Sequence, residues 1–155
     1  MAGKAVAKSA SQGQAIWMLG GLYELLLSGD ETDGKTTVVQ FTIPVGAAPP
    51  LHTHNCDETV YVIDGTLRYH IDGEIFEGGP GSIFHIPAGV EENFEPTSLL
   101  KIIGVYHGGS MDKFFAEAGE LAKSRQVPPA PSSPPDLERV AEIGARHGLV
   151  LIPAA

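Results

Sequence analysis

The sequence predicts an all-β protein, an antiparallel sandwich or barrel, followed by short α-helices at its C-terminal end. Three observations predict this fold class. Short apolar stretches, several of them alternating or β-branched, recur from residue 16 to residue 107. Asp-Gly and Gly-Gly pairs, which favour tight turns, lie between them. Helical periodicity begins after residue 110, so the pattern indicates antiparallel sheets rather than alternating strand and helix units.

The first strands are predicted from two apolar segments. Residues 16–27 are apolar but interrupted by Gly20-Gly21, which predicts two short strands. Residues 36–45 alternate and are rich in β-branched side chains, which predicts a strand that ends at Pro44.

The middle of the chain is predicted to form two hairpins. Residues 58–65 and 66–73 each end in Asp-Gly, the pair that two-residue hairpin turns favour. We therefore expect these two strands to pair with one another across Asp64-Gly65, and a second hairpin to turn at Asp72-Gly73. Three further strands are expected at residues 74–78, 82–89 and 99–107.

The C-terminal region changes character. Met111–Lys123 is amphipathic with a helical period, and Asp136 can cap a second helix over residues 137–147. Residues 126–135 are rich in proline and are expected to form a linker. The apolar residues 149–153 are expected to pack either on the barrel or on a second copy of the chain.

Length and composition indicate one domain. The 155 residues suit a single domain with a sizeable core. We expect a disordered lead-in over residues 1–15, a barrel over residues 16–110 and a helical extension over residues 111–155. The first lysines are not followed by a continuous apolar segment, and no run reaches about 18 apolar residues. Neither a signal peptide nor a membrane helix is therefore expected.

Charge and cysteine content limit the partners. Asp+Glu number 19 and Lys+Arg number 10, and the formal net charge of -9 opposes binding to nucleic acid or to an anionic membrane surface. The single cysteine, Cys56, excludes an internal disulfide, which fits a reducing compartment. We therefore expect a cytoplasmic protein whose partner is a small molecule.

The stretch from residue 46 to residue 65 carries the candidate chemistry. His52, His54 and Glu58 share one parity, so in extended backbone they can point to one side of one sheet. Two imidazoles and a carboxylate form the protein half of a facial metal triad with open coordination positions. The alternative, a surface loop with two solvated histidines, requires this spacing between apolar strands to be a coincidence.

This stretch also resembles the first sequence motif of the cupin superfamily. That motif is a glycine, five residues, His-x-His, three or four residues, a glutamate, six residues and a glycine. Every fixed position is matched, by Gly46, His52, His54, Glu58 and Gly65.

Residues 81–96 resemble the second cupin motif in part. Gly81, Pro87 and Gly89 match it, but Glu92 stands at its histidine position and Pro96 at its asparagine position.

The two motifs, a WxLGGLxE pattern near residue 17 and a final ARxGL pattern together resemble small single-domain cupins of the quercetin dioxygenase type. The resemblance implies a double-stranded β-helix, or jelly roll, that is open at one end. It further implies dioxygenase activity on an enolic ring and, commonly, a homodimer.

Three roles are open for Glu92. As a ligand it would complete a site of two histidines and two carboxylates, a harder set that favours Mn²⁺, Fe²⁺ or Zn²⁺ over copper. Buried beside Glu58, it would instead be poised for proton transfer, because burial and a like charge disfavour its ionised form. In the third role it is a solvated residue on the loop after Pro87.

The function predicted from these residues is a metal-dependent enzyme. The candidate ligands are His52, His54, Glu58 and Glu92, the candidate catalytic residues are Glu58 and Glu92, and the metal is Mn, Fe, Ni, Cu or Zn. Val60 and Val62 share the parity of Glu58, so we expect an apolar cavity floor and a small hydrophobic substrate. The first candidate reaction is a dioxygenation. The alternatives are a non-redox cyclase, isomerase or dehydratase, and a cupin that binds without turnover.

Overall fold

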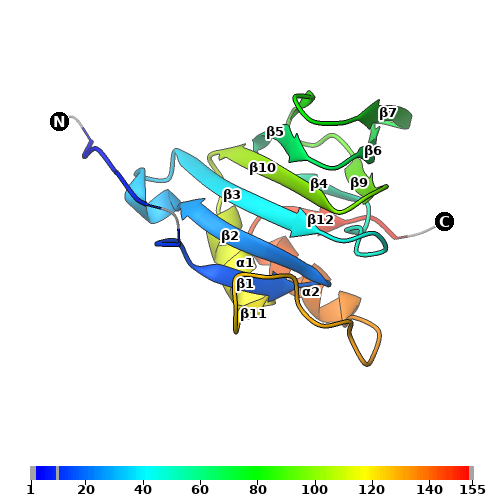
Figure 1. Cartoon of the computed structure of the whole chain (residues 1–155). Helices are drawn as coiled ribbons and strands as arrows, with labels where there is room; N and C mark the ends of the chain where they lie inside the picture. Colours follow the sequence, from blue (N-terminus) through cyan, green and yellow to red (C-terminus); the bar gives the residue numbers. More distant parts are fainter. Residues whose placement is uncertain (1–2, 10, 154–155) are drawn as a thin grey trace.

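The computed structural model describes residues 3–9 and 11–153 and has two antiparallel sheets with helices at one end (Figure 1). The larger sheet has the strand order β11-β1-β2-β3-β10-β5-β8, and the smaller sheet has the order β12-β4-β9-β6-β7. This arrangement confirms the predicted all-β class with C-terminal helices. Within the described residues, no helix is long and apolar enough to cross a membrane.

The strands are short, and consecutive strands often lie in different sheets. The larger sheet contains β1 (Ala15–Met18), β2 (Gly21–Leu27), β3 (Thr36–Ile43), β5 (Asp57–Asp64), β8 (Ile83–Ile86), β10 (Leu100–His107) and β11 (Glu120–Leu121). The smaller sheet contains β4 (His52–His54), β6 (Leu67–Ile71), β7 (Glu74–Gly78), β9 (Glu92–Pro96) and β12 (Leu149–Leu151). The helices are the 3-10 helix η1 (Gly29–Glu31), α1 (Met111–Ala118) and α2 (Leu137–Arg146).

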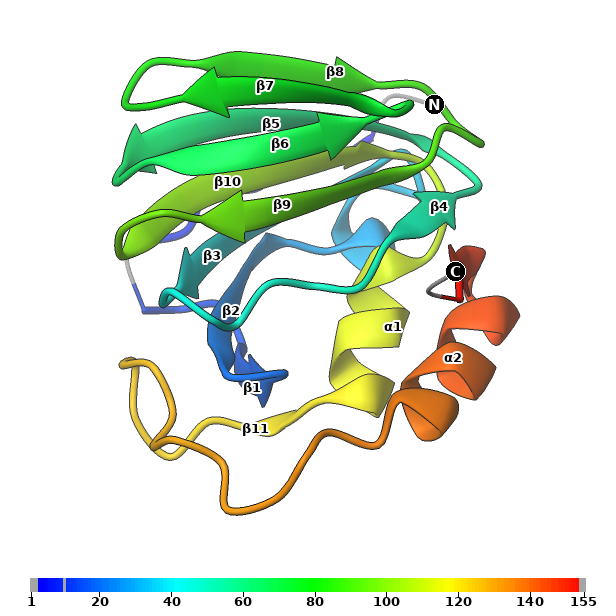
Figure 2. The ribbon, with the colours of Figure 1, turned by 90° about the vertical axis from the view of Figure 1, so that its right-hand side faces the viewer.

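The core lies between the inner faces of the two sheets. Along β3 and β10 every second side chain is buried, because a strand presents alternate residues to opposite faces. The helices α1 and α2 lie side by side at one end of the sheets (Figure 2). From α1, Met111, Phe114 and Phe115 are buried in the same core as Phe41 and Ile102. The helices therefore close one end of the barrel with apolar side chains.

The hairpin predicted across Asp64-Gly65 was wrong. β5 pairs with β10 and β8, whereas β6 pairs with β7 and β9, so the chain crosses between sheets at Gly65. A type I′ hairpin turn needs a positive φ at both central residues, and here φ is positive at Gly65 but not at Asp64. Glycine is required because a Cβ at Gly65 would lie 2.1 Å from the carbonyl oxygen of Leu99.

The turn predicted at Asp72-Gly73 is confirmed. It joins β6 to β7, and φ is 51° at Asp72 and 78° at Gly73. The two strands predicted within residues 16–27 are also confirmed as the hairpin β1–β2. Its turn is Leu19-Gly20 rather than Gly20-Gly21, and again both φ angles are positive.

The C-terminal region is shorter in helix than predicted and contributes to both sheets. The helix expected over Met111–Lys123 ends at Ala118, because Gly119 has extended backbone and the chain continues as β11 beside β1. A side chain at position 119 is excluded, since a Cβ there would lie 2.2 Å from Ile16. Asp136 caps α2 as predicted, by accepting a hydrogen bond from the backbone N–H of Arg139. The apolar tail packs on the barrel, where β12 pairs with β4.

The predicted domain limits stay a prediction. The lead-in over residues 1–15 includes residues 1, 2 and 10, and the extension over residues 111–155 includes residues 154 and 155. These five residues lie outside the described part of the chain.

Candidate metal centre

β4 aims two histidines into the barrel. It pairs with β12 on one side and meets β9 on the other, where His52 lies opposite Glu92. His52 and His54 are buried, and Thr53 between them faces the other side. The alternation of a strand therefore brings both imidazoles to the inner face, as the His-x-His spacing predicts.

Glu58 reaches the same interior from the opposite sheet. We predicted that His52, His54 and Glu58 project from one sheet, and this was wrong. The chain leaves the smaller sheet after His54, and Glu58 lies on β5 of the larger sheet. The shared parity still brings the side chains together, because the inner faces of both sheets line one interior.

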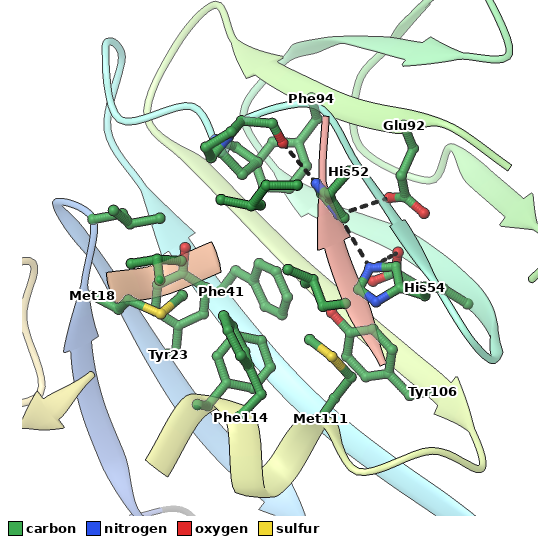
Figure 3. A pocket seen from close by; sticks show the side chains of 18 residues that line it. Met18, Tyr23, Phe41, His52, His54, Glu92, Phe94, Tyr106, Met111 and Phe114 are labelled. Atoms are coloured by element: carbon green, nitrogen blue, oxygen red, sulfur yellow. Dashed lines mark hydrogen bonds and ion pairs between the residues drawn. The ribbon is translucent and has the colours of Figure 1, made fainter. Parts of the chain in front are cut away.

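The four predicted site residues lie close together. Three of them, His52, His54 and Glu92, form a tighter group (Figure 3). The Nε2 atoms of His52 and His54 are 3.1 Å apart, and His52 Nε2 is 3.9 Å from Glu92 Oε1. One ligand atom from each of these three residues lies within 4.8 Å of the other two. Glu58 lies outside this group and approaches His54, with 3.7 Å between Glu58 Oε1 and His54 Nε2. Its role as a ligand stays a prediction.

The protonation of both imidazoles suits ligation. His52 Nδ1 is 2.7 Å from the carbonyl oxygen of Pro50, which can only accept, so Nδ1 carries the proton and Nε2 keeps its lone pair toward the cluster. Burial, and next the nearby charge of His52, lower the pKa of His54 from 6.5 to about 3. At neutral pH His54 is therefore a neutral imidazole.

Three buried polar atoms of the site have no hydrogen-bond partner among the described residues. They are His54 Nδ1, Glu58 Oε1 and Glu92 Oε2. A buried polar atom without a partner costs roughly 1–3 kcal/mol, and more when it belongs to a charged group. Imidazole nitrogens and carboxylate oxygens together bind divalent transition ions. The residues present therefore fit a divalent metal ion.

Two tyrosines at the site were not anticipated. The Tyr69 hydroxyl donates a hydrogen bond of 2.7 Å to Glu92 Oε1, and both side chains are buried. Tyr106 lies opposite Glu58 in the β5–β10 pair, where it favours the ionised form of Glu58. Local sequence patterns do not reveal the position of Tyr69 beside Glu92, because it depends on the pairing of β6 with β9.

The two carboxylates share one buried environment. Glu92 is 1% exposed, so the solvated alternative for this residue is wrong. Burial, and next the charge of Glu92, raise the pKa of Glu58 well above its ordinary value. The ligand and acid–base alternatives for Glu92 remain open.

An apolar cavity adjoins the cluster. Val60 and Val62 are buried but do not line it, so our expectation for the cavity floor was wrong. Its walls come instead from β1 and the turn after it, β2, β3, β9, β10, both α-helices and β12. The apolar and aromatic side chains that line the cavity are Met18, Leu19, Tyr23, Phe41, Pro49, Pro50, Phe94, Tyr106, Met111, Phe114, Phe115, Val140, Leu149 and Leu151. An apolar cavity is present, although sequence parity pointed to the wrong residues.

Comparisons with known proteins agree with this architecture. The family model of the cupin domain matches residues 39–103, which include all four predicted site residues. A quercetin 2,3-dioxygenase of Bacillus subtilis (strain 168) is 27% identical over 114 residues, covering 72% of this chain and 34% of that protein. The chain thus spans about a third of the length of this curated relative.

Two solved structures have a similar fold. An RmlC-like cupin from Shewanella frigidimarina NCIMB 400 matches with a TM-score of 0.61 and 19% identity, over 72% of this chain and 98% of that one. The polyketide cyclase RemF from Streptomyces resistomycificus matches with a TM-score of 0.58 and 18% identity, over 67% of this chain and 80% of that one. At these identities the likeness concerns the fold alone.

Proposed function

Because this chain is a small protein of the cupin superfamily, we propose that it is a metal-dependent enzyme acting on a small hydrophobic, enolic or aromatic substrate. The first candidate reaction is a dioxygenation. One observation carries the proposal: His52, His54 and Glu92 converge, buried, beside a cavity with aromatic walls. The similarity to a quercetin 2,3-dioxygenase supports the reaction class.

The ligand set of the proposed site is His52, His54 and Glu92, with Glu58 as a fourth candidate. A divalent metal held there supplies Lewis acidity toward a substrate oxygen and, for a redox ion, electrons for oxygen chemistry. Tyr69 fixes Oε1 of Glu92, the oxygen nearest to His52, by its hydrogen bond, and Oε2 has no partner within the described residues. The backbone carbonyl of Pro50 fixes the tautomer of His52.

Glu58 is the candidate for proton transfer. Its raised pKa means that the carboxyl gives up a proton less readily than a solvated one, and its conjugate base takes one more readily. Oε1 of Glu58 has no partner within the described chain and can exchange a proton with an enolic hydroxyl. The aromatic walls exclude water, which strengthens the electrostatic interactions of both carboxylates.

A second candidate is a non-redox cyclisation or isomerisation. One feature favours it: a carboxylate, Glu92, stands where the second cupin motif has a histidine. It lies beside another carboxylate whose pKa is raised. Two adjacent carboxyl groups can divide the acid and base roles of such a reaction.

Oxygen consumption separates the two candidates. We would purify the protein without chelator, measure its metal content, and record oxygen uptake with quercetin as the probe flavonol under air and under nitrogen. Dioxygenation predicts oxygen uptake and, with 18O-labelled O2, both labelled oxygen atoms recovered in the products taken together. A product of unchanged mass that also forms under nitrogen would support the non-redox candidate.

The metal requirement is tested separately. We expect about one metal per chain, lost in the double variant His52→Ala/His54→Ala and kept in His70→Ala, which removes an imidazole from the outer side of β6. Metal content that does not respond to the double variant would contradict the proposed site.

We also propose that two copies pair through the outer face of the larger sheet. Tyr61 and Ile83 lie opposite one another in the β5–β8 pair and are 48% and 66% exposed, and Ile63 is exposed on the same face. Apolar side chains gathered on one sheet face are typical of an interface. Light scattering should give twice the mass of the chain. Ile83→Glu places a charge in the proposed interface, so the measured mass of this variant should be that of one chain.

A further inference from the structure

A second, outer pocket lies directly against the cavity of the site. Its own lining comes from β1, the C-terminal end of α1, β11 and the N-terminal end of α2. Three side chains, Met18, Leu19 and Val140, line both the outer pocket and the inner cavity. A single apolar layer therefore separates the surface from the interior at this point.

This shared layer lies away from the histidines. In Figure 3, Met18 and Tyr23 lie at one end of the cavity, whereas His52, His54 and Glu92 lie at the other. The aromatic rings of Phe41 and neighbouring residues lie between the two ends. A molecule that passed Met18 would therefore travel along an apolar wall before it met the cluster.

The backbone at Leu19 is strained. Leu19 and Gly20 form the two-residue turn of the β1–β2 hairpin, with φ of 50° and 82°. Such turns favour Asn, Asp or Gly, and the β6–β7 hairpin of the same chain uses Asp72-Gly73. Leucine is a poor residue for this conformation, which crowds its Cβ. Strain of this kind is found where function requires a particular side chain.

The side chain of Leu19 gives a reason for that strain. It lines both pockets, as does Met18, whose unbranched chain can adopt several conformations. An Asn or Gly at position 19 would relax the turn but would remove an apolar side chain from the layer between the pockets.

The outer pocket is more polar than the cavity. Trp17 and Pro135 lie beside Glu120, Asp136 and Arg139. The guanidinium group of Arg139 has five N–H groups. Two of them donate hydrogen bonds to the carbonyl oxygens of Ala118 and Glu117. The remaining N–H groups can bind a ligand oxygen. The two carboxylates oppose a full negative charge, so a hydroxyl or carbonyl suits the pocket better than an anion.

We propose that the outer pocket is the entrance to the site and a second subsite for its ligand, with Met18, Leu19 and Val140 as the gate. The ligand class is an elongated molecule with an apolar body for the cavity and a hydroxyl- or carbonyl-bearing end for Arg139. This inference rests on the proposed function in one respect: it assumes that the reaction takes place at the end of the cavity that holds His52 and Glu92.

The gate is tested by the rate at which an apolar probe enters. We would measure binding of N-phenyl-1-naphthylamine by stopped-flow fluorescence, because its signal requires neither metal nor turnover. Met18→Trp should slow association and dissociation at least about tenfold, since both pass the gate, and Met18→Ala should speed both. The matched control Leu26→Trp, on exposed β2 surface, should leave both rates unchanged.

Rates unchanged in both Met18 variants would overturn the gate. If Met18→Trp does not fold, the probe rates of Met18→Ala alone test the gate, because this substitution only shortens the side chain. Normal metal content with unchanged probe rates would reject the gate and leave the proposed function standing. Altered probe rates in a protein that binds no metal would support the gate and reject the proposed function.

The outer subsite is tested by Arg139→Met. Loss of a hydrogen bond should raise the Kd of quercetin about fivefold and leave that of N-phenyl-1-naphthylamine within about twofold. Equal changes for both probes, or none, would reject the subsite. Thermal unfolding of the variant reports separately on the contacts of Arg139 with Ala118 and Glu117.

Discussion

The two ends of the inner cavity are unusual in different ways. At the histidine end, the unsatisfied groups are polar atoms: His54 Nδ1, Glu58 Oε1 and Glu92 Oε2 are buried without hydrogen-bond partners in the described structure. At the other end the side chains are apolar and the strain lies in the backbone of Leu19. Unsatisfied polar atoms fit an ion that stays bound, whereas a strained turn between two pockets fits a ligand that passes.

The largest effect is expected at the histidine end, from replacing Glu92. Glu92→Leu should abolish stoichiometric metal binding if the carboxylate is a ligand, because it removes a donor that faces His52. Glu92→His should retain metal and shift preference toward copper or nickel, since it restores the donor type of the cupin motif. Metal analysis of both variants, with Glu95→Leu on the outer side of β9 as control, checks this.

Metal retained in Glu92→Leu would instead assign Glu92 to acid–base chemistry. In that case activity, rather than metal content, should fall in the variant.

The next effect concerns Tyr69, which holds Glu92 without itself facing the cavity. Tyr69→Phe removes the hydroxyl that donates to Glu92 Oε1 and should weaken metal affinity about 10–100-fold, the usual range for a partner of a metal ligand. Calorimetric titration with Zn²⁺ measures the affinity. Tyr23→Phe also removes a buried tyrosine hydroxyl, but one at the Met18 end, and should leave the affinity unchanged. Equal losses in both variants would point to general damage to the core.

The sequence predicted the histidine end far better than the Met18 end. His52 and His54 lie within a few residues of one another, and strand alternation alone brings them to one face. The Met18 end is assembled from the β1–β2 turn, α1 and α2, which lie far apart in the chain. Local patterns predict these elements but not which of them meet.

Assignment of strands to sheets limited the prediction in the same way. Along β5, which carries Glu58, and along β6, every second side chain points inward. This alternation is the same whichever sheet a strand belongs to, because the inner faces of both sheets line one interior. Pairing β5 with β6 was therefore compatible with the pattern and was wrong. Leu99 lies close to Gly65, where the chain crosses from one sheet to the other. This contact forms only in the folded structure, so the local sequence does not predict it.

The pH dependence of stability distinguishes the two ends, since the carboxyl and imidazole groups that line the cavity gather at one of them. Burial and the charge of Glu92 raise the pKa of Glu58 above 4.5, so the folded state keeps a proton that the unfolded state has released. Stability of the metal-free protein therefore falls as pH rises from 4.5 through the folded-state pKa. His54 has the opposite effect below pH 6.5, where its lowered pKa costs stability as pH falls toward 3.

Glu58→Gln isolates the first of these effects. The amide does not titrate, so the stability of wild type relative to the variant should decline with rising pH, measured by urea unfolding between pH 5 and pH 8. Parallel curves for the two proteins would show that Glu58 ionises in the folded state as it does in the unfolded state. Glu95→Gln, exposed on β9, serves as the control.

The smallest effect is expected from substitutions at the first turn residue of the β1–β2 and β6–β7 hairpins. Leu19→Asn relieves roughly 1–2 kcal/mol of left-handed backbone strain but removes a half-buried apolar side chain worth about 1 kcal/mol. Its unfolding free energy should therefore stay within about 1 kcal/mol of wild type. Asp72→Leu adds the strain at an exposed turn with nothing to offset it, and should lose about 1–2 kcal/mol. Urea unfolding measures both, and a loss above about 2 kcal/mol in Leu19→Asn would mean that Leu19 is kept for packing rather than for the gate.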